Sequence, residues 1–301
     1  MRESDAPLVT VAVPLYRSRP HVENIVGNIE RLSSEAYEVL ISDRHGADDA
    51  WDVLRTRFGG EPRVRFVRTL DGADWVEHYN ALLRGSRARY FLWMPHDDEY
   101  PAAYVSTLVS ALEAAPDALL GFGVMQSVDD GRGKSDGFEP PPLMDGEAWS
   151  PRVAARLLMT WSAGAAFRGV FRRDAIVGNH LFIERTPTLS RADIYWVFGV
   201  ALLGSLLFVP ETWCRKHYRA DGASAGWPVT WATALDEYRV PARYLRRTPV
   251  PSGDLWRIRL ALAAAAAIRL GWATGRHFGL GRHGAPRWGR RAFEGALSRW
   301  L

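Results

Sequence analysis

The sequence of 301 residues has little cysteine, little lysine and no long apolar run. Its one cysteine, Cys214, cannot form an intramolecular disulfide, which excludes a disulfide-stapled secreted scaffold. The start at Met1 has no basic and apolar leader, so we expect a cytoplasmic protein. The longest uncharged run, residues 194–210, only reaches the lower limit for a membrane span and contains two glycines, so we interpret it as a buried helix followed by a strand.

The basic charge of the chain is concentrated at its C-terminal end. Only Lys134 and Lys216 are lysines, and the other 36 of 38 basic residues are arginine. Residues 252–301 have a net charge of +7, and the preceding residues have a net charge of −3. Arginine and tryptophan together predict a helical extension over residues 226–301, which fits either peripheral contact with the inner face of an anionic membrane or a solvated appendage on the core. We expect no nucleic-acid binding, because no binding module accompanies the basic charge.

Strand and helix patterns alternate through the first third of the chain. A β-branched apolar run at residues 8–13 predicts a buried strand, and apolar positions at helical spacing follow at 20–32. Such alternation predicts an α/β fold with a mainly parallel sheet flanked by helices, whose ligands bind beyond the carboxyl ends of the strands. Further strands are predicted at 37–41, 64–67, 90–94 and 206–209, further helices at about 48–58, 75–85, 102–115 and 151–160, and candidate site loops at 14–18, 42–49 and 95–101.

Three consecutive acids follow the predicted strand at residues 90–94. Asp97, Asp98 and Glu99 repel one another when they are brought close, unless a cation neutralises them. A hard divalent cation, Mn²⁺ or Mg²⁺, takes such oxygen ligands and keeps positions for waters and substrate phosphates. The alternative is a solvated acidic turn that caps the next helix.

A second candidate acid, Asp43, follows the predicted strand at residues 37–41. Its carboxylate is suited to accept hydrogen bonds from a pyrimidine imide or from ribose hydroxyls. The alternative is an Asx turn that leads into the next helix. The residues alone leave both interpretations open.

The order of these segments resembles the inverting glycosyltransferases of family 2, which have the GT-A fold. Residues 13–16 (Val-Pro-Leu-Tyr) are similar to the strand end of that family, with Arg17 in place of the usual asparagine. Residues 41–49 match the length of its segment of acid, Gly-Ser-Thr and acid, and residues 75–80 are similar to its asparagine-bearing helix. The resemblance covers residues 8–225, and the order and spacing of the motifs carry it, since none is specific by itself.

The resemblance implies a role for several residues. The acidic motif of the family commonly reads Asp-x-Asp-Asp, and Pro95 replaces its first acid here. Ala192 and Asp193 fall where the family has Glu-Asp, which implies Asp193 as the catalytic base, although a helix cap is the alternative for this residue. His217 resembles the family's histidine after the last core strand, although it could equally be an ordinary surface or core histidine. The implied donor-binding residues are Pro14, Tyr16, Asp43, Asn80 and Asp97, and the implied ligands of Mn²⁺ or Mg²⁺ are Asp98 and His217.

These expectations describe a metal-dependent inverting glycosyltransferase that moves a sugar from a nucleotide-diphosphate donor to a glycan, lipid-linked or small-molecule acceptor. Residues 1–225 would form the catalytic domain, with a nucleotide-binding half to about residue 101 and an acceptor half over residues 102–225. A non-catalytic GT-A-like binding module is one alternative, because three family positions are altered. A sugar-phosphate nucleotidyltransferase is another, although its first loop should be rich in glycine and the loop at 14–18 has none.

Overall fold

The computed structural model describes residues 7–32, 37–44, 46–68, 74–129, 149–160, 164–218 and 230–277. Contacts divide the chain into two compact units, which we call the sheet unit and the helical unit. The sheet unit consists of Met1–Glu139, Ala165–Phe182 and Leu206–Ala220, and the helical unit of Pro140–Gly164, Ile183–Ser205 and Asp221–Leu301. This division runs differently from the expected boundary after residue 225, because two segments from the middle of the chain group with the C-terminal extension.

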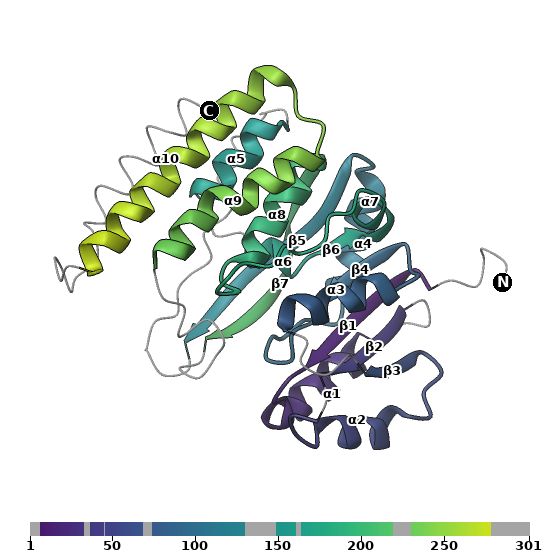
Figure 1. Ribbon diagram of the computed structural model, residues 1–301. Coiled ribbons are helices and arrows are strands. Elements are labelled where there is room, and N and C mark those ends of the chain that lie inside the picture. Colours follow the sequence, from purple (N-terminus) through teal and green to yellow (C-terminus); the bar gives the residue numbers. More distant parts are fainter. Residues whose placement is uncertain are drawn as a thin grey trace. The chain divides into compact units, whose positions relative to one another are not determined.

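The sheet unit is built on a seven-stranded sheet with the order β3-β2-β1-β4-β6-β5-β7 (Figure 1). The strands β1 to β4 run parallel where they pair, whereas β6 is antiparallel to β4 and to β5. The expected α/β sheet with flanking helices is therefore confirmed, and its parallel part consists of the first four strands. The strands are β1 (Val9–Leu15), β2 (Tyr37–Asp43), β3 (Val64–Arg68), β4 (Tyr90–Trp93), β5 (Ala118–Asp129), β6 (Val170–Arg172) and β7 (Ser205–Tyr218).

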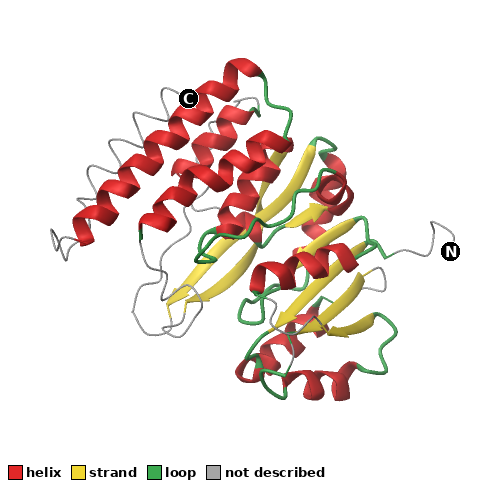
Figure 2. Ribbon diagram, in the orientation of Figure 1, coloured by secondary structure: helices red, strands yellow, loops and turns green. Residues whose placement is uncertain are grey.

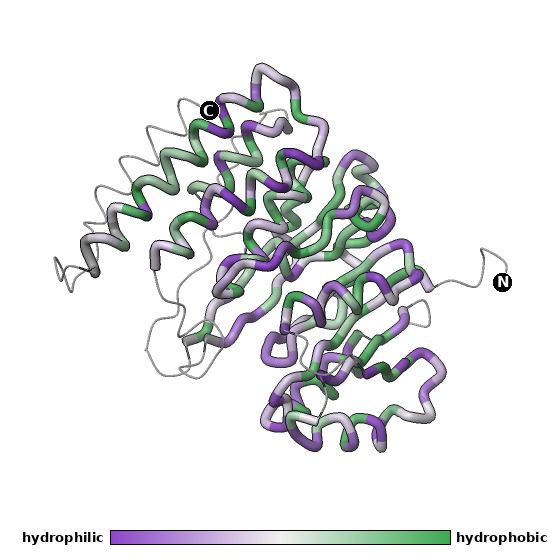
Figure 3. The backbone as a smooth tube through the Cα atoms, in the orientation of Figure 1, coloured by the Kyte–Doolittle hydropathy of each residue, from purple (hydrophilic) through white to green (hydrophobic). Residues whose placement is uncertain are grey.

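Helices accompany the strands of this unit, as Figure 2 shows. All seven residues of β1 are buried, as in a strand that is covered on both faces, and this explains its continuous apolar sequence. Figure 3 shows hydrophobic residues along the central strands. The helices are the 3₁₀ turn η2 (Arg19–His21), α1 (Val22–Arg31), α2 (Ala50–Phe58), α3 (Trp75–Gly85), α4 (Tyr104–Ala114), α6 (Gly164–Phe167) and α7 (Arg173–Gly178).

The strands β5 and β7, at one edge of the sheet, differ most from the prediction. The strand expected at 206–209 continues through Pro210 to the end of β7. Proline lacks an N–H group but is tolerated in an edge strand, and β7 is the last strand of the sheet. The strand β5 was not predicted, because Gly121 and Gly123 lower the strand propensity of its sequence.

The helical unit consists of α5 (Pro151–Thr160), α8 (Ala192–Leu203), α9 (Trp231–Arg247) and α10 (Ser252–His277). Almost the whole of α8 is buried, which confirms the buried-helix interpretation of the uncharged run. A Cβ atom at Gly199 would lie 2.5 Å from the Tyr244 ring, so glycine allows α8 to pack closely on α9. The predicted extension is helical at α9 and α10, and residues 278–301 lie outside the described part of the chain.

None of the described helices combines the length and the apolar character that a membrane crossing requires.

Candidate functional site

Three loops meet at the carboxyl ends of β1, β2 and β4, where the strand order reverses beside β1. We call the loop after β4, residues 95–99, the acidic turn. Ser18 Oγ lies 2.6 Å from His96 Nδ1 and so joins the loop after β1 to the acidic turn. The Arg19 N–H donates to Asp48 Oδ2 over 2.7 Å and joins the same loop to the one after β2. The loops that the sequence placed at one edge of the sheet are therefore in contact.

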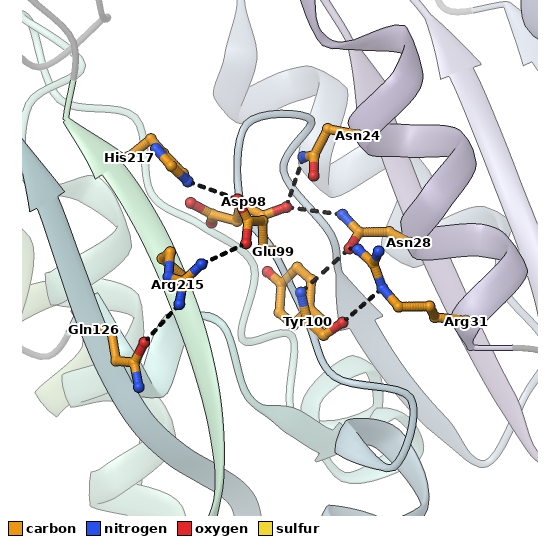
Figure 4. A network of polar contacts seen from close by, with 9 residues as sticks. All are labelled: Asn24, Asn28, Arg31, Asp98, Glu99, Tyr100, Gln126, Arg215 and His217. Carbon is orange, nitrogen blue, oxygen red and sulfur yellow. Dashed lines mark hydrogen bonds and ion pairs between the residues drawn. The ribbon is translucent and has the colours of Figure 1, made fainter. Parts of the chain in front are cut away.

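Two asparagines of α1 hold the backbone of the acidic turn (Figure 4). Asn24 Nδ2 donates to the carbonyl oxygens of His96 and Asp98, each over 2.9 Å. Asn28 Nδ2 donates to the Asp98 carbonyl over 2.8 Å, and its Oδ1 accepts from the Tyr100 N–H over 3.2 Å. The two asparagines are four residues apart and share one face of the helix, so α1 fixes the course of the turn.

The strand β7 holds the acidic turn from the other side. The backbones of Glu99 and Arg215 exchange two hydrogen bonds of 2.9 Å. The Glu99 carboxylate accepts from Arg215 over 2.9 Å and lies 2.9 Å from His217 Nε2 (Figure 4). His217 therefore lies at the acidic turn, and its role as a ligand stays a prediction. Glu99 could not be singled out among the three acids from the sequence, because its partners are more than a hundred residues away.

The side chain of Asp98 points into the protein. It is 0% exposed, and its Oδ2 accepts from Arg168 Nε over 2.5 Å, with the Arg168 side chain 7% exposed. Its Oδ1 is buried without a hydrogen-bond partner among the described residues. Burial raises the pKa of Asp98, and the Arg168 guanidinium opposes that rise. The expectation that Asp98 is a metal ligand does not fit this placement, because its carboxylate is enclosed and paired with a cation.

Asp97 is the acid that the turn leaves available. It is half-buried, and its carboxylate makes no hydrogen bond or ion pair with any residue in the described ranges. Within those same ranges, no three His, Cys, Asp or Glu side chains are grouped as a metal site. Mg²⁺-type ions are often held by one or two carboxylates together with substrate phosphates and waters. The residues present therefore fit an ion that a diphosphate helps to hold, with Asp97 as the protein carboxylate.

Pro14, Tyr16 and Asp43 come together at the ends of β1 and β2. Pro14 is in register with Ser42, and the next pair in the ladder includes Asp43. Tyr16 is 45% exposed, and the guanidinium carbon of Arg44 lies 4.8 Å from its ring centroid. This pair offers an accessible aromatic ring beside a cation at the edge of the sheet.

The Asp43 carboxylate makes contacts within its own loop. Its Oδ2 accepts from the Gly46 N–H over 3.1 Å and lies 3.7 Å from Arg68 Nε. This bond spans three residues rather than the two of an Asx turn, so Asp43 makes a local loop contact of a different kind.

The helix α3 places two polar side chains beneath this region. His78 Nε2 lies 2.9 Å from Ser42 Oγ. Burial, and then the charge of Arg44, lower the pKa of His78 to about 4, so this imidazole is neutral at pH 7. Asn80 is also buried on α3. The sequence did not point to His78, because a histidine on a helix gives no sign of its burial.

Asp193 belongs to the helical unit and is the second residue of α8. Its Oδ1 is buried and has no hydrogen-bond partner in the part of the chain that the structure describes. The residue before the helix, Arg191, has a left-handed backbone with φ of 56°. A carboxylate without a partner is chemically suited to accept a proton, and its assignment as a base stays a prediction.

Comparison with known sequences matches residues 10–172, more than half of the chain, to the family model "Glycosyl transferase family 2". A putative teichuronic acid biosynthesis glycosyltransferase, TuaG of Bacillus subtilis, is 26% identical over 94 residues, which are 31% of this chain and 37% of that protein. The uncharacterized protein y4gI of Sinorhizobium fredii is 26% identical over 144 residues, which are 46% of this chain and 16% of that protein. The chain thus spans much less than two thirds of each relative.

Solved structures share the fold at low sequence identity. TarS 1–349 of S. aureus, in complex with UDP-GlcNAc, has a TM-score of 0.67 at 12% identity, covering 85% of this chain and 72% of that one. The mannosyltransferase PcManGT of Pyrobaculum calidifontis, in complex with GDP-Man and Mn²⁺, has a TM-score of 0.57 at 18% identity, covering 97% and 80%. These likenesses confirm the expected GT-A fold. The match over residues 10–172 establishes that the chain belongs to glycosyl transferase family 2.

Proposed function

We propose that the protein transfers a sugar from a nucleotide-diphosphate donor to an acceptor hydroxyl, with inversion at the anomeric carbon and with a requirement for Mn²⁺ or Mg²⁺. The observation that carries the proposal is the acidic turn at the carboxyl end of β4, which is held from two sides and presents the Asp97 carboxylate, without a partner among the described residues. Family membership supports a glycosyl transfer. The UDP-GlcNAc and GDP-Man complexes of TarS and PcManGT support a nucleotide sugar as the donor.

The acidic turn would hold the diphosphate end of the donor. We assign the metal-ligand role to Asp97 rather than to Asp98, because Asp98 is buried against Arg168. When bound, the cation supplies positive charge against the diphosphate as it departs. His217, which Glu99 orients, lies at the same turn and is proposed to face the diphosphate or the cation.

The ends of β1 and β2 would hold the nucleoside. Tyr16 provides a flat face for a nucleobase, and Arg44 lies beside it. Asp43 provides acceptor oxygens for imide or ribose donors, with Pro14 alongside it in the sheet. Asn80 is also proposed to contact the nucleotide-sugar donor.

Asp193 would act as the base. Its carboxylate takes the proton of the acceptor hydroxyl while the acceptor oxygen bonds to the anomeric carbon, and the electron pair of the broken glycosidic bond leaves with the diphosphate. A glycan, a lipid-linked sugar and a small molecule are all possible acceptors. For a lipid-linked acceptor, peripheral membrane contact through the C-terminal extension is proposed, where Trp256 of α10 is 53% exposed beside Arg257.

The test begins with nucleotide binding by isothermal titration calorimetry. UDP, GDP, CDP and dTDP are titrated with and without Mn²⁺ into the wild-type protein, Asp97→Asn and the matched control Glu113→Gln, a surface acid of α4. We expect one nucleotide to bind in a Mn²⁺-dependent manner, Asp97→Asn to lose that dependence, and the control to keep it. The sugar donors of that nucleotide are then supplied with acceptors, and the anomeric configuration of the product is read by NMR.

The outcomes separate the parts of the proposal. A product of retained configuration would contradict inversion, and nucleotide binding that is indifferent to Mn²⁺ would contradict the metal requirement. Binding without turnover of any donor would favour a non-catalytic binding module. If transfer occurs, Asp193→Asn should lower kcat by about 10²- to 10⁴-fold, the range for loss of a general base, while nucleotide binding is unchanged.

A further inference from the structure

The helix that carries Asp193 starts from a strained turn. Leu189 and Arg191 have φ of 58° and 56°, in the left-handed region that non-glycine residues seldom adopt. Arg191 is the N-cap of α8, and its side chain makes no capping hydrogen bond. Such a backbone persists only where its surroundings hold it. The position of Asp193, two residues further on, therefore depends on what holds Arg191.

Arg191 forms an ion pair with a carboxylate of α9, and its guanidinium carbon also lies 5.8 Å from the ring centroid of Tyr195. Arg191 Nε lies 3.2 Å from Glu237 Oε1, and Arg269 Nε of α10 lies 3.4 Å from the same oxygen. The Glu237 side chain is 9% exposed, so the pair is shielded from solvent more than a surface ion pair is. The start of α8 is thus attached to α9 and α10 within the helical unit through one acid.

Two acids compete for the charge of Arg191. Burial is the largest single effect on the pKa of Arg191 and acts to lower it, but Glu237, then Tyr195 and Asp193, together raise it. As long as Glu237 engages the guanidinium, the Asp193 Oδ1 has no hydrogen-bond partner among the described residues. If Glu237 lost its charge, the acid left to attract Arg191 would be Asp193, the proposed base.

We propose that Glu237 is a positioning residue for Asp193, because it holds the strained turn at Arg191 and keeps the guanidinium away from the Asp193 carboxylate. The inference rests on the proposed function of Asp193. It gives the C-terminal helices α9 and α10 a part in the activity that does not require a membrane.

The test compares Glu237→Gln with a matched control, Glu184→Gln. Glu184 is also a largely buried acid of the helical unit, and it pairs with Arg243 and Arg247 of α9. We expect Glu237→Gln to lower kcat by about 10- to 100-fold, the size of effect that misplacing a reacting group has. The donor KM should stay within about twofold, and the control should leave both constants within about twofold, since neither change touches the donor site.

Hydrogen exchange gives a readout that does not depend on activity. The Tyr195 N–H donates to the Arg191 carbonyl over 3.0 Å in the first turn of α8. In Glu237→Gln, exchange in a peptide covering residues 189–198 should speed up by about tenfold or more, because the turn opens more often. Glu184→Gln should leave the exchange of that peptide unchanged.

A second variant removes the strain and the unpaired charge together. Glycine adopts the left-handed conformation without strain, so Arg191→Gly in the Glu237→Gln background removes both the strain and the unpaired guanidinium. We expect this double variant to recover most of the lost kcat. If Glu237→Gln fails to fold, the double variant is the test, and a double variant that is unfolded or inactive overturns the proposal.

The remaining outcomes distinguish the positioning role of Glu237 from the assignment of Asp193 as the base. A folded Glu237→Gln protein with unchanged kcat and unchanged exchange overturns the positioning role. If instead exchange rises in Glu237→Gln but Asp193→Asn keeps wild-type kcat, the positioning contact stands and the assignment of the base fails.

Discussion

The acidic turn and the start of α8 leave a candidate functional acid unpaired by the same device. At the acidic turn, Asp98 engages Arg168, and Asp97 stays without a partner among the described residues. At α8, Glu237 engages Arg191. In each region a second acid pairs with the nearby arginine, which leaves the proposed ligand Asp97 or the proposed base Asp193 able to take up a cation or a proton.

The two regions differ in how they are held. The acidic turn is held by neutral amides of α1 on its backbone and by the partly exposed pair of Glu99 with Arg215, and its Asp98–Arg168 ion pair is almost completely enclosed. The start of α8 has a strained backbone and an ion pair whose arginine is 26% exposed. Loss of an enclosed pair leaves a buried charge, whereas a more exposed pair can rearrange toward solvent. We therefore expect damage to the first region to appear mainly as lost stability and damage to the second mainly as lost activity.

The largest stability effect is expected for Arg168→Met. The change leaves the buried Asp98 carboxylate without its cation, and breaking one side of a buried pair costs about 3–5 kcal/mol. Urea unfolding at pH 7 measures this loss. The double variant Arg168→Met with Asp98→Asn removes both charges and should recover a large part of it, and a double variant no more stable than Arg168→Met would show that the charge is not the cause.

The stability of the single variant Arg168→Met should depend on pH with a definite sign. Burial already raises the pKa of Asp98, and without Arg168 it rises further. The folded variant then binds a proton more readily than the unfolded chain, so its stability increases as the pH falls. The deficit relative to the wild type should shrink between pH 7 and pH 5, and a deficit that grows in acid would contradict the interpretation.

A smaller effect, of opposite sign, is expected from His78. The unfolded chain takes up a proton near pH 6.5, whereas burial holds the folded pKa at about 4. The wild type therefore loses stability as the pH falls through this window, by about 3 kcal/mol at most for this group. His78→Gln should lose less stability than the wild type between pH 7 and pH 4 in urea titrations. Equal slopes for the two proteins would mean that His78 is not held neutral by the fold.

The smallest of these effects tests the neutral anchoring of the acidic turn. Asn28→Ala removes one donor to the Asp98 carbonyl and an acceptor for the Tyr100 N–H and the Arg31 guanidinium, which should cost about 1–3 kcal/mol. Because no charge is lost, the cost should be the same at low salt and in 1 M NaCl. A cost that disappears at high salt would make the anchoring of this turn electrostatic, like that of α8.

The sequence allowed much of the architecture to be predicted, because periodic patterns carry it. The apolar run of β1 and the helical spacing of α1 placed the loops, and strand order then placed Asp43 and the acids at one edge. No periodic pattern tells which of two consecutive acids in a turn is buried, so the roles of Asp97 and Asp98 could not be told apart from the sequence. Their partners are also distant in sequence, since Arg168 lies 70 residues from Asp98.

The strand β5, the full length of the edge strand β7 and the contacts of the helical unit were missed for a related reason. Two glycines lower the predicted strand propensity of β5. Pro210 predicts the end of a strand, although β7 continues past it at the edge of the sheet. The attachment of Arg191 to Glu237 depends on a left-handed backbone and on packing between helices. Neither leaves a local pattern in the sequence.

The most direct test of the account is the electron paramagnetic resonance of Mn²⁺ in the presence of the nucleotide that binds. We expect the wild type and the surface control Glu113→Gln to convert the signal of aqueous Mn²⁺ into that of a bound ion only when nucleotide is added, because the diphosphate completes its coordination. Asp97→Asn should leave the aqueous signal at the same concentrations. A bound-ion signal of equal strength in Asp97→Asn would contradict the claim that the acidic turn presents this carboxylate to the cation.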